Sequence, residues 1–287
     1  MDFKNAQELL TLCDENKLKI SAVMLRRECD ETECSEESAV KRMKKALEIM
    51  RDSVENPIEH PRKSMGGLIG GEAEKLSWSK GKLSGKVLGK AVCYAVGVLE
   101  VNASMGLIVA APTAGSSGVV PGLLLAMQDE LDFTDDQIVE ALFNAAAVGY
   151  LAMRNATVAG AVGGCQAEIG VASAMAASAA VELMGGTPKQ CLDAAGMVLM
   201  NMLGLVCDPV GGLVEYPCQS RNAAGAANAI VAAEMALAGI SQLIPFDEML
   251  DTMFKVGKKL PAELRETALG GCAATPTACM LCKKHKQ

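Results

Sequence analysis

Apolar residues recur along this chain at intervals of three and four, the spacing that places them on one face of an α-helix. Strict alternation of β-branched and aromatic residues, which is typical of strands, is scarce. We therefore expect an all-α fold, organised as a single compact multi-helix domain. The pattern predicts helices over 5–18, 21–54, 85–103, 119–131, 134–153, 166–184, 187–203, 222–240, 245–256 and 261–268.

Polar residues between the apolar runs mark where helices begin and end. The charged stretch 21–54 is either one long helix or two helices with a break near Cys34, because Ser35 can cap a second helix. Thr134 followed by Gln137 has the spacing of a capping box. Thr187 before a proline similarly opens a helix.

The run 105–127 carries no charged residue over 23 positions, which is long enough for a membrane helix. It also contains Pro112 and Pro121, with glycines between them, and these would leave backbone polar groups unpaired in lipid. We interpret the run as a buried loop followed by a buried helix. A helical membrane protein is the alternative, and we expect no membrane association.

Composition narrows the class of protein. Hydrophobic residues make up 50% of the chain but aromatic residues only 3%, so small side chains fill the interior and helices can pack closely. The net charge of −7 and the lack of a basic stripe argue against a nucleic-acid partner. The N-terminus is polar and has no signal-peptide pattern. Eleven cysteines in a chain that we expect to be cytoplasmic indicate reduced thiols, used for metal binding or catalysis rather than disulfides.

Three cysteines stand where glycine or proline interrupts the helical pattern: Cys165, Cys207 and Cys218. Rigid breaks beside helices allow three thiolates to converge on one metal centre, leaving one coordination position open. The alternative is that they are ordinary buried core residues. Cys29 and Cys34 lie among acidic residues, which should raise the pKa of their thiols and make them poor metal ligands.

Two loops carry further candidate chemistry. The segment 56–74 has two glycine pairs that permit an anion-binding nest, to which Lys63 and Ser64 add a cation and a hydroxyl; a flexible crossover loop explains the pattern equally. The second loop presents the hydroxyls of Thr113, Ser116 and Ser117 before the helix at 119–131. A helix N-terminus favours a carboxylate or phosphate, although ordinary capping accounts for these residues as well.

The motifs around these residues together resemble the iron–sulfur-dependent L-serine dehydratases, in their alpha chain or catalytic domain. The resemblance covers roughly 56–277, leaving N-terminal charged helices at 1–55 and a tail at 278–287. The motifs that carry it are Ala111-Pro112-Thr113-Ala114-Gly115-Ser116-Ser117-Gly118, Gly164-Cys165-Gln166-Ala167-Glu168, Cys207-Asp208-Pro209-Val210 and Glu215-Tyr216-Pro217-Cys218-Gln219-Ser220-Arg221-Asn222.

The resemblance implies a 4Fe-4S cluster held by Cys165, Cys207 and Cys218, with one iron free for substrate. It also implies a helical catalytic domain whose glycine- and proline-rich loops converge on the cluster, and a second, beta component. No N-terminal segment of this sequence matches that component, so we expect a separate beta chain and a hetero-oligomer. In single-chain relatives a C-terminal cysteine can occupy the open iron; the candidates in this tail are Cys272, Cys279 and Cys282.

The implied activity is dehydration and deamination of L-serine to pyruvate and ammonia, as in amino-acid catabolism and gluconeogenesis. We assign the carboxylate and amine of serine to the loops at 113–117 and 63–71, with Arg221 and Asn222 also able to face the substrate. No catalytic base is evident: His60 is a candidate, and a partner residue is favoured. The alternatives are a lyase for another small amino acid such as threonine or cysteine, and a non-catalytic iron–sulfur sensor or subunit.

Overall fold

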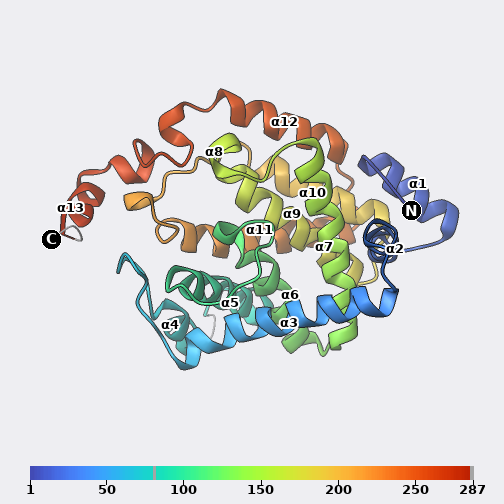
Figure 1. The fold of residues 1–287 in the computed structure, drawn as a ribbon, viewed down its shortest axis with the longest axis horizontal. Helices are drawn as coiled ribbons and strands as arrows, with labels where there is room; N and C mark the ends of the chain where they lie inside the picture. The colour runs from blue at the N-terminus through green and yellow to red at the C-terminus, as the bar shows by residue number, and fades with distance from the viewer. Residues whose placement is uncertain (80–81, 285–287) are drawn as a thin grey trace.

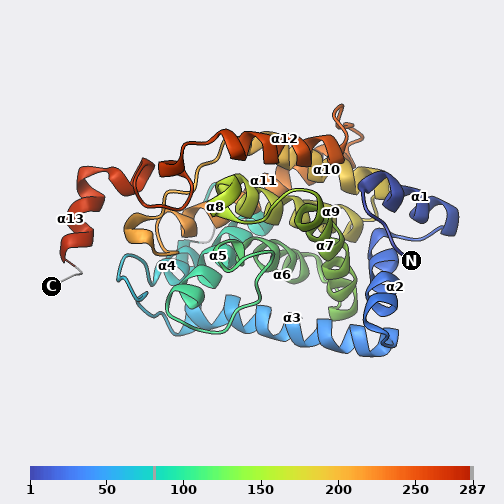
Figure 2. The same ribbon diagram turned by 45° about the horizontal axis from the view of Figure 1, so that its top comes forward.

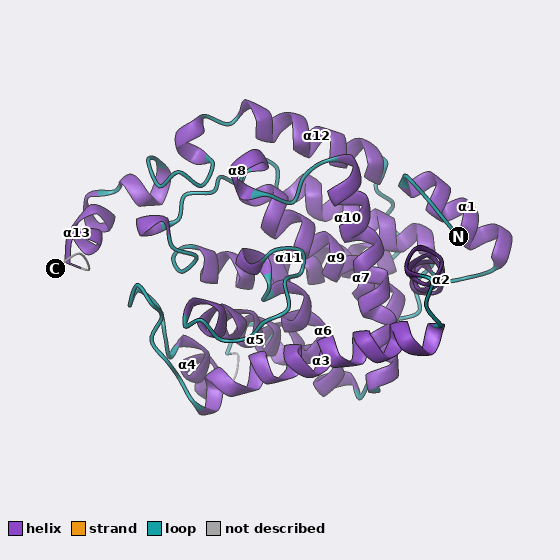
Figure 3. Ribbon diagram, viewed as in Figure 1, coloured by secondary structure: helices purple, strands orange, loops and turns teal. Residues whose placement is uncertain are grey.

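The computed structural model describes residues 1–79 and 82–284, and Figures 1 and 3 show this part of the chain as helices joined by loops, without a strand. The all-α prediction is therefore confirmed. The α-helices are α1 (Ala6–Asn16), α2 (Ile20–Thr32), α3 (Glu36–Glu59), α4 (Glu72–Ser79), α5 (Gly85–Ala103), α6 (Val119–Leu131), α7 (Asp135–Asn155), α8 (Gly160–Gly163), α9 (Val171–Leu183), α10 (Pro188–Asn201), α11 (Cys218–Leu237), α12 (Phe246–Lys259) and α13 (Pro276–Lys284).

Helix α9 forms the centre of the domain. Every residue from Val171 to Glu182 is buried, as expected for a helix that is apolar all round. It packs against α6, α7, α10 and α11, and its alanines and serines let these neighbours approach closely. At Gly225 of α11 an added Cβ would lie 2.7 Å from the Ser173 hydroxyl of α9, so only glycine fits there. Figure 2 shows α12 along one side of this core and α3 along the opposite side.

The chain 105–127 folds partly as expected. Its second half forms α6, which is buried from Val119 to Met127. The expectation of a buried loop before it is confirmed only in part: Ser116 and Ser117 are fully buried, but Met105 and Leu107 are 76% and 71% exposed. Met105 adopts a left-handed conformation (φ 63°) at the end of α5 and turns the chain onto the surface. Within the described residues, no helix has both the length and the apolar character needed to cross a bilayer.

Other elements differ from the sequence-based pattern for identifiable reasons. The break near Cys34 is confirmed, since α2 ends at Thr32 and Ser35 caps α3 through the N–H of Ser38. The short helix α4 was not predicted, because its cap is the Glu100 carboxylate on α5, which accepts the N–H groups of Gly71, Glu72 and Ala73. The helix expected over 261–268 is reduced to one 3₁₀ turn at Ala262–Leu264.

The expected division of the chain into three parts remains a prediction. Helix α3 runs across the boundary at 55–56 without interruption, and α13 crosses the one at 277–278. Part of the expected tail is thus helical, and it extends at one end of the molecule (Figure 1). The final tail residues, 285–287, lie outside the described part of the chain.

Candidate functional site

Two of the three predicted cysteines meet at the centre of the candidate site. The sulfur atoms of Cys165 and Cys207 and a carboxylate oxygen of Glu168 all lie within 4.8 Å of one another. Both cysteines are buried, at 2% and 3% exposure. They come from segments 42 residues apart, so their meeting is a product of the tertiary structure.

Backbone hydrogen bonds between loops place these two cysteines. Cys165 directly precedes the π-helical turn η2 (Gln166–Gly170), and the N–H of Gln166 donates to the carbonyl of Leu205 at 3.0 Å. Cys207 sits in a short parallel bridge with Arg265: its N–H donates to the Leu264 carbonyl at 2.9 Å, and its own carbonyl accepts the N–H of Glu266 at 2.7 Å. The thiols are thus carried on tightly bound backbone rather than on free loops.

Glycines keep the space around Glu168 open. A Cβ on Gly160 would lie 2.4 Å from Oε2 of Glu168 and 3.0 Å from the sulfur of Cys207. A Cβ on Gly115 would lie 3.2 Å from Oε1 of the same carboxylate. Glycine at these two positions lets the chain close around the thiols and the carboxylate without displacing them.

The third cysteine, Cys218, is the first residue of α11 and is also buried. It lies outside the 4.8 Å group but close enough that Cys165 and Glu168 add to the effect of burial, which raises the pKa of its thiol to about 12. One turn later, Arg221 forms an ion pair of 2.7 Å with Asp208 and donates to the carbonyl of Val206 at 2.9 Å. A guanidinium is therefore fixed beside the cysteines, where it offsets the negative charge of thiolates.

Burial and neighbouring groups disfavour the ionised forms of Cys207 and Glu168. The hydrogen bond with Cys165 and then burial raise the pKa of the Cys207 thiol far above its usual range. Burial, followed by the charge of Glu266, raises the pKa of the Glu168 carboxyl. Because thiolates rather than thiols bind metals, loading of this site must release protons and will be favoured by higher pH.

The loop at 113–118 joins the site through its hydroxyls. The Thr113 hydroxyl donates to Oε1 of Glu168 at 3.0 Å and lies 3.0 Å from the hydroxyl of Ser116. Ser117 donates instead to the carbonyl of Ala114 at 2.8 Å, which is a local capping bond. Of the three hydroxyls predicted here, that of Thr113 contacts Glu168, that of Ser116 contacts Thr113, and that of Ser117 is occupied within the turn.

Asn222 connects this loop to the helix that carries Cys218. Its amide nitrogen donates to the carbonyls of Gly115 and Cys218, at 2.8 and 2.9 Å, and its amide oxygen accepts the N–H of Gly118 at 3.0 Å. The side chain is fully buried. Asn222 thus acts as a brace between the two segments, because these three bonds occupy both ends of its amide.

The glycine-rich loop does form a nest for an anion, and the anion comes from the chain itself. The buried carboxylate of Glu215 accepts the hydroxyl of Ser64 at 2.6 Å, the N–H of Gly66 at 2.6 Å and the N–H of Leu68 at 3.1 Å. Ser64 is therefore engaged with Glu215, while Lys63 is exposed. Glu215 stands three residues before Cys218 in the chain. Its bonds to Ser64, Gly66 and Leu68 therefore link the position of this loop to that of the third cysteine.

We expect Glu215→Gln to destabilise the protein. The carboxylate of Glu215 accepts one O–H and two N–H donors, and the amide of glutamine would point its own N–H groups at some of them. The loss should be about 1–3 kcal/mol of unfolding free energy, as for other buried charged hydrogen bonds. Denaturant unfolding of the full chain measures it. The control is Glu48→Gln, an exposed site on α3 that should change stability by less than about 0.5 kcal/mol. Equal effects of the two substitutions would contradict this role for Glu215.

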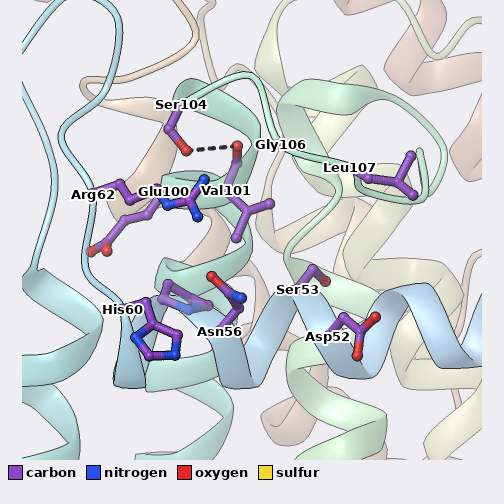
Figure 4. Close-up of a pocket in the computed structure, with 11 residues that line it drawn as sticks. Asp52, Ser53, Asn56, His60, Arg62, Glu100, Val101, Ser104, Gly106 and Leu107 are labelled. Carbon is purple, nitrogen blue, oxygen red and sulfur yellow. Dashed lines mark hydrogen bonds between the residues drawn. The ribbon is translucent and has the colours of Figure 1, made fainter.

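The structure separates His60 from the cysteines. His60 is exposed at the end of α3 and lines a pocket between α3 and α5 together with Asn56, Arg62 and Glu100 (Figure 4). No cysteine lines that pocket. His60 is thus poorly placed to act as a base at the cysteine site.

Among the tail cysteines, Cys272 is bonded to a residue of the site. Its N–H donates to Oδ2 of Asp208, the residue after Cys207, at 2.6 Å. Cys279 is exposed, and the sulfur of Cys282 lies close to Gly211. Cys272 is therefore the tail cysteine whose backbone is anchored beside the predicted ligands.

The residues present fit an iron–sulfur cluster. Cysteine thiolates are the usual protein ligands of such clusters, and here two buried cysteines lie together, with the buried Cys218 and Arg221 nearby. The glycines at 115 and 160 leave room that any side chain would fill. The carboxylate of Glu168 and the hydroxyl of Thr113 add oxygen donors at the same place, which a purely structural thiolate site does not need.

Glu168 and Glu215 are charged residues of this site to which no role was assigned from sequence. Glu168 stood in the motif around Cys165 and Glu215 in the one before Cys218, but neither position revealed its contacts. The available signal was composition: each is a carboxylate in an otherwise uncharged, small-residue segment, and a buried carboxylate requires partners.

An all-helical chain that gathers buried cysteines, a carboxylate and a hydroxyl in this way has the donor side chains that a metal or cluster site requires. The family profile described as "Serine dehydratase alpha chain" matches residues 15–273. The chain belongs to that family, as its motifs predicted.

Similar proteins agree with this assignment. A "Probable L-serine dehydratase, alpha chain" of Bacillus subtilis (strain 168) is 50% identical over 285 residues, covering 98% of this chain and 95% of the relative. The "L-serine dehydratase, alpha chain" of Peptoniphilus asaccharolyticus is 42% identical, covering 95% and 94%. The "L-serine dehydratase" of Helicobacter pylori (strain ATCC 700392 / 26695) is 37% identical over 96% of this chain but only 62% of its own length. This chain thus matches alpha chains almost end to end and corresponds to part of a longer single-chain relative.

Proposed function

We propose that this chain is the cluster-binding subunit of an L-serine dehydratase, which converts L-serine to pyruvate and ammonia. The observation that carries the proposal is the group formed by the buried Cys165 and Cys207 and the partly buried Glu168, with the hydroxyl of Thr113 bonded to the Glu168 carboxylate. Family membership and the names of the relatives support serine as the substrate.

Cys165, Cys207 and Cys218 would hold a 4Fe-4S cluster. When bound, such a cluster supplies a Lewis acid that makes the β-hydroxyl of serine a better leaving group. Three cysteine ligands leave one coordination position for the substrate, which is what this chemistry requires.

The residues of this chain orient and neutralise the substrate. The hydroxyl of Ser116 can donate to the carboxylate of serine, and the hydroxyl of Thr113 can do so in place of its bond to Glu168. The guanidinium of Arg221, fixed by Asp208, keeps positive charge beside the thiolates. Glu168 accepts a hydrogen bond from the Thr113 hydroxyl and lies against the Cys207 sulfur. It therefore connects the loop at 113–118 with a predicted cluster ligand.

A second polypeptide, the beta chain, would complete the enzyme. The relative named "L-serine dehydratase" is longer than this chain, and more than a third of its length lies outside the matched region. His60, the candidate base considered from sequence, lines a different pocket. A residue of the partner is thus the favoured source of the base that removes the α-proton.

Anaerobic reconstitution tests the proposal. The chain is loaded with iron and sulfide, alone and with the candidate beta chain, and pyruvate formation from L-serine is measured beside L-threonine and L-cysteine. Pyruvate that requires both loading and serine supports the proposed reaction. A stable cluster without turnover in either preparation would favour a sensor or structural subunit, and failure to bind iron would reject the three-cysteine site.

Removing the Thr113 hydroxyl should weaken serine binding without loss of the cluster. A hydrogen bond to a charged group contributes about 1.5–3 kcal/mol, so Thr113→Val, which keeps the shape, should raise the KM for serine at least about tenfold. Thr113→Ser keeps the hydroxyl and is the matched control. Steady-state kinetics with iron content measured on the same samples decides the matter: an unchanged KM in Thr113→Val would rule out this role.

A further inference from the structure

Two cysteines outside the candidate site lie side by side where α2 ends. Glu33 adopts a left-handed conformation (φ 50°), and the N–H of Cys34 donates to the carbonyl of Cys29 at 3.2 Å. This six-to-one bond is that of a Schellman motif, in which the side chains at these two positions contact each other. The backbone of the turn therefore places the two cysteines next to each other on the surface of the helix end.

The surroundings of Cys34 favour its thiolate. The hydroxyl of Thr32 donates to its sulfur at 3.1 Å, and Nη2 of Arg42 donates to it at 3.4 Å. The hydrogen bond from Thr32 and then that from Arg42 lower the pKa of the Cys34 thiol, although acidic neighbours predicted a raised value. The sequence-based expectation is wrong for Cys34, because Arg42 on the next helix turns towards it and also pairs with Glu28.

The partner thiol behaves in the opposite way. Burial, contact with Cys34 and the charges of Glu36 and Glu28 raise the pKa of Cys29. Both thiols are partly exposed, so reagents reach them, whereas Cys13 is buried and burial raises the pKa of its thiol to about 12. One activated and one protonated thiol in contact form the arrangement of an attacking and a resolving cysteine.

We propose that Cys29 and Cys34 are a redox-active pair that a low-molecular-weight disulfide oxidises to an internal disulfide, independently of the cysteines of the candidate site. The Cys34 thiolate attacks one sulfur of the reagent, forms a mixed disulfide and releases one reagent thiolate. That thiolate takes the proton of Cys29, and Cys29 then attacks the sulfur of Cys34 and releases the second reagent thiolate. Two protein thiols are oxidised, and the reagent is reduced to two thiols.

The experiment uses the full-length, cluster-loaded chain under anaerobic conditions with glutathione disulfide. Samples are alkylated at intervals and digested with trypsin, and the masses of the peptides are measured by mass spectrometry. The peptide 28–41 contains Cys29 and Cys34 and no other cysteine, so an internal disulfide appears as a loss of two hydrogens. We expect this product in the parent protein to form faster than any adduct at the exposed Cys279, and Cys29→Ser to stop at a glutathione adduct on Cys34.

A matched pair of variants tests the role of the guanidinium. Arg42→Gln should slow the reaction of Cys34 about threefold or more, because less of the thiol is ionised. Lys45→Gln removes the same charge from an exposed position of α3 and should leave the rate unchanged. The proposal is overturned if Cys34 reacts no faster than Cys279, if Arg42→Gln reacts at the parental rate, or if the parent accumulates the adduct without closing to Cys29.

Discussion

Cys207→Ala is expected to abolish cluster binding and serine dehydration together. Substitution of groups that merely support a metal ligand typically costs about 10–100-fold, so loss of the ligand itself should lower activity by about 100-fold or more. The physical reason is that Cys207 lies within 4.8 Å of both Cys165 and Glu168, and no other described cysteine joins that group. Iron and sulfide content, the visible spectrum and pyruvate formation are measured on the same reconstituted sample.

The control for this prediction is Cys279→Ala, which removes an exposed thiol of α13. It should retain iron and activity. Far-ultraviolet circular dichroism shows whether each variant is folded, so that misfolding is not mistaken for loss of a ligand. An active Cys207→Ala protein with a full complement of iron would remove Cys207 from the ligand set.

Gly160→Ala is expected to damage the site by a single methyl group. The added Cβ would lie 2.4 Å from the Glu168 carboxylate and 3.0 Å from the Cys207 sulfur, and both distances are too short for van der Waals contact. Overpacking of this kind costs about 1–3 kcal/mol of stability. Because the displaced groups belong to the proposed site, activity should fall about tenfold or more, as when a supporting residue of a metal site is altered.

Gly170→Ala provides the matched comparison for Gly160→Ala. The same methyl group would there lie 3.7 Å or more from its nearest neighbours, so it fits without displacing them. The free energy of unfolding should stay within about 1 kcal/mol of the parent value. Iron content and the rate of serine dehydration should change by no more than a few-fold. Equal behaviour of the two variants would show that the space at Gly160 is not needed.

Much of the fold followed from local patterns. The helical spacing of apolar residues predicted the helices that form the core, and the Ser35, Thr134 and Thr187 caps lie where the chain shows them. These features depend on residues within one turn of each other, so neighbouring letters of the sequence suffice to predict them. Among the exceptions, α4 and the turn at Ala262–Leu264 have weak local signals, and α4 depends on a carboxylate from another helix.

The candidate site also has parts that the sequence predicted and parts that it did not. From the sequence by itself, three cysteines, the hydroxyls before α6 and the glycines that permit close approach could be identified as candidate site residues. Each is a characteristic residue type at a break between helices. Only the tertiary structure decided that Glu168 meets Thr113 across 55 positions, that Glu215 fills the nest of Gly66, and that His60 faces another pocket. The physical reason is that a buried carboxylate takes whichever donors the packed helices bring to it, and these donors are distant in the chain.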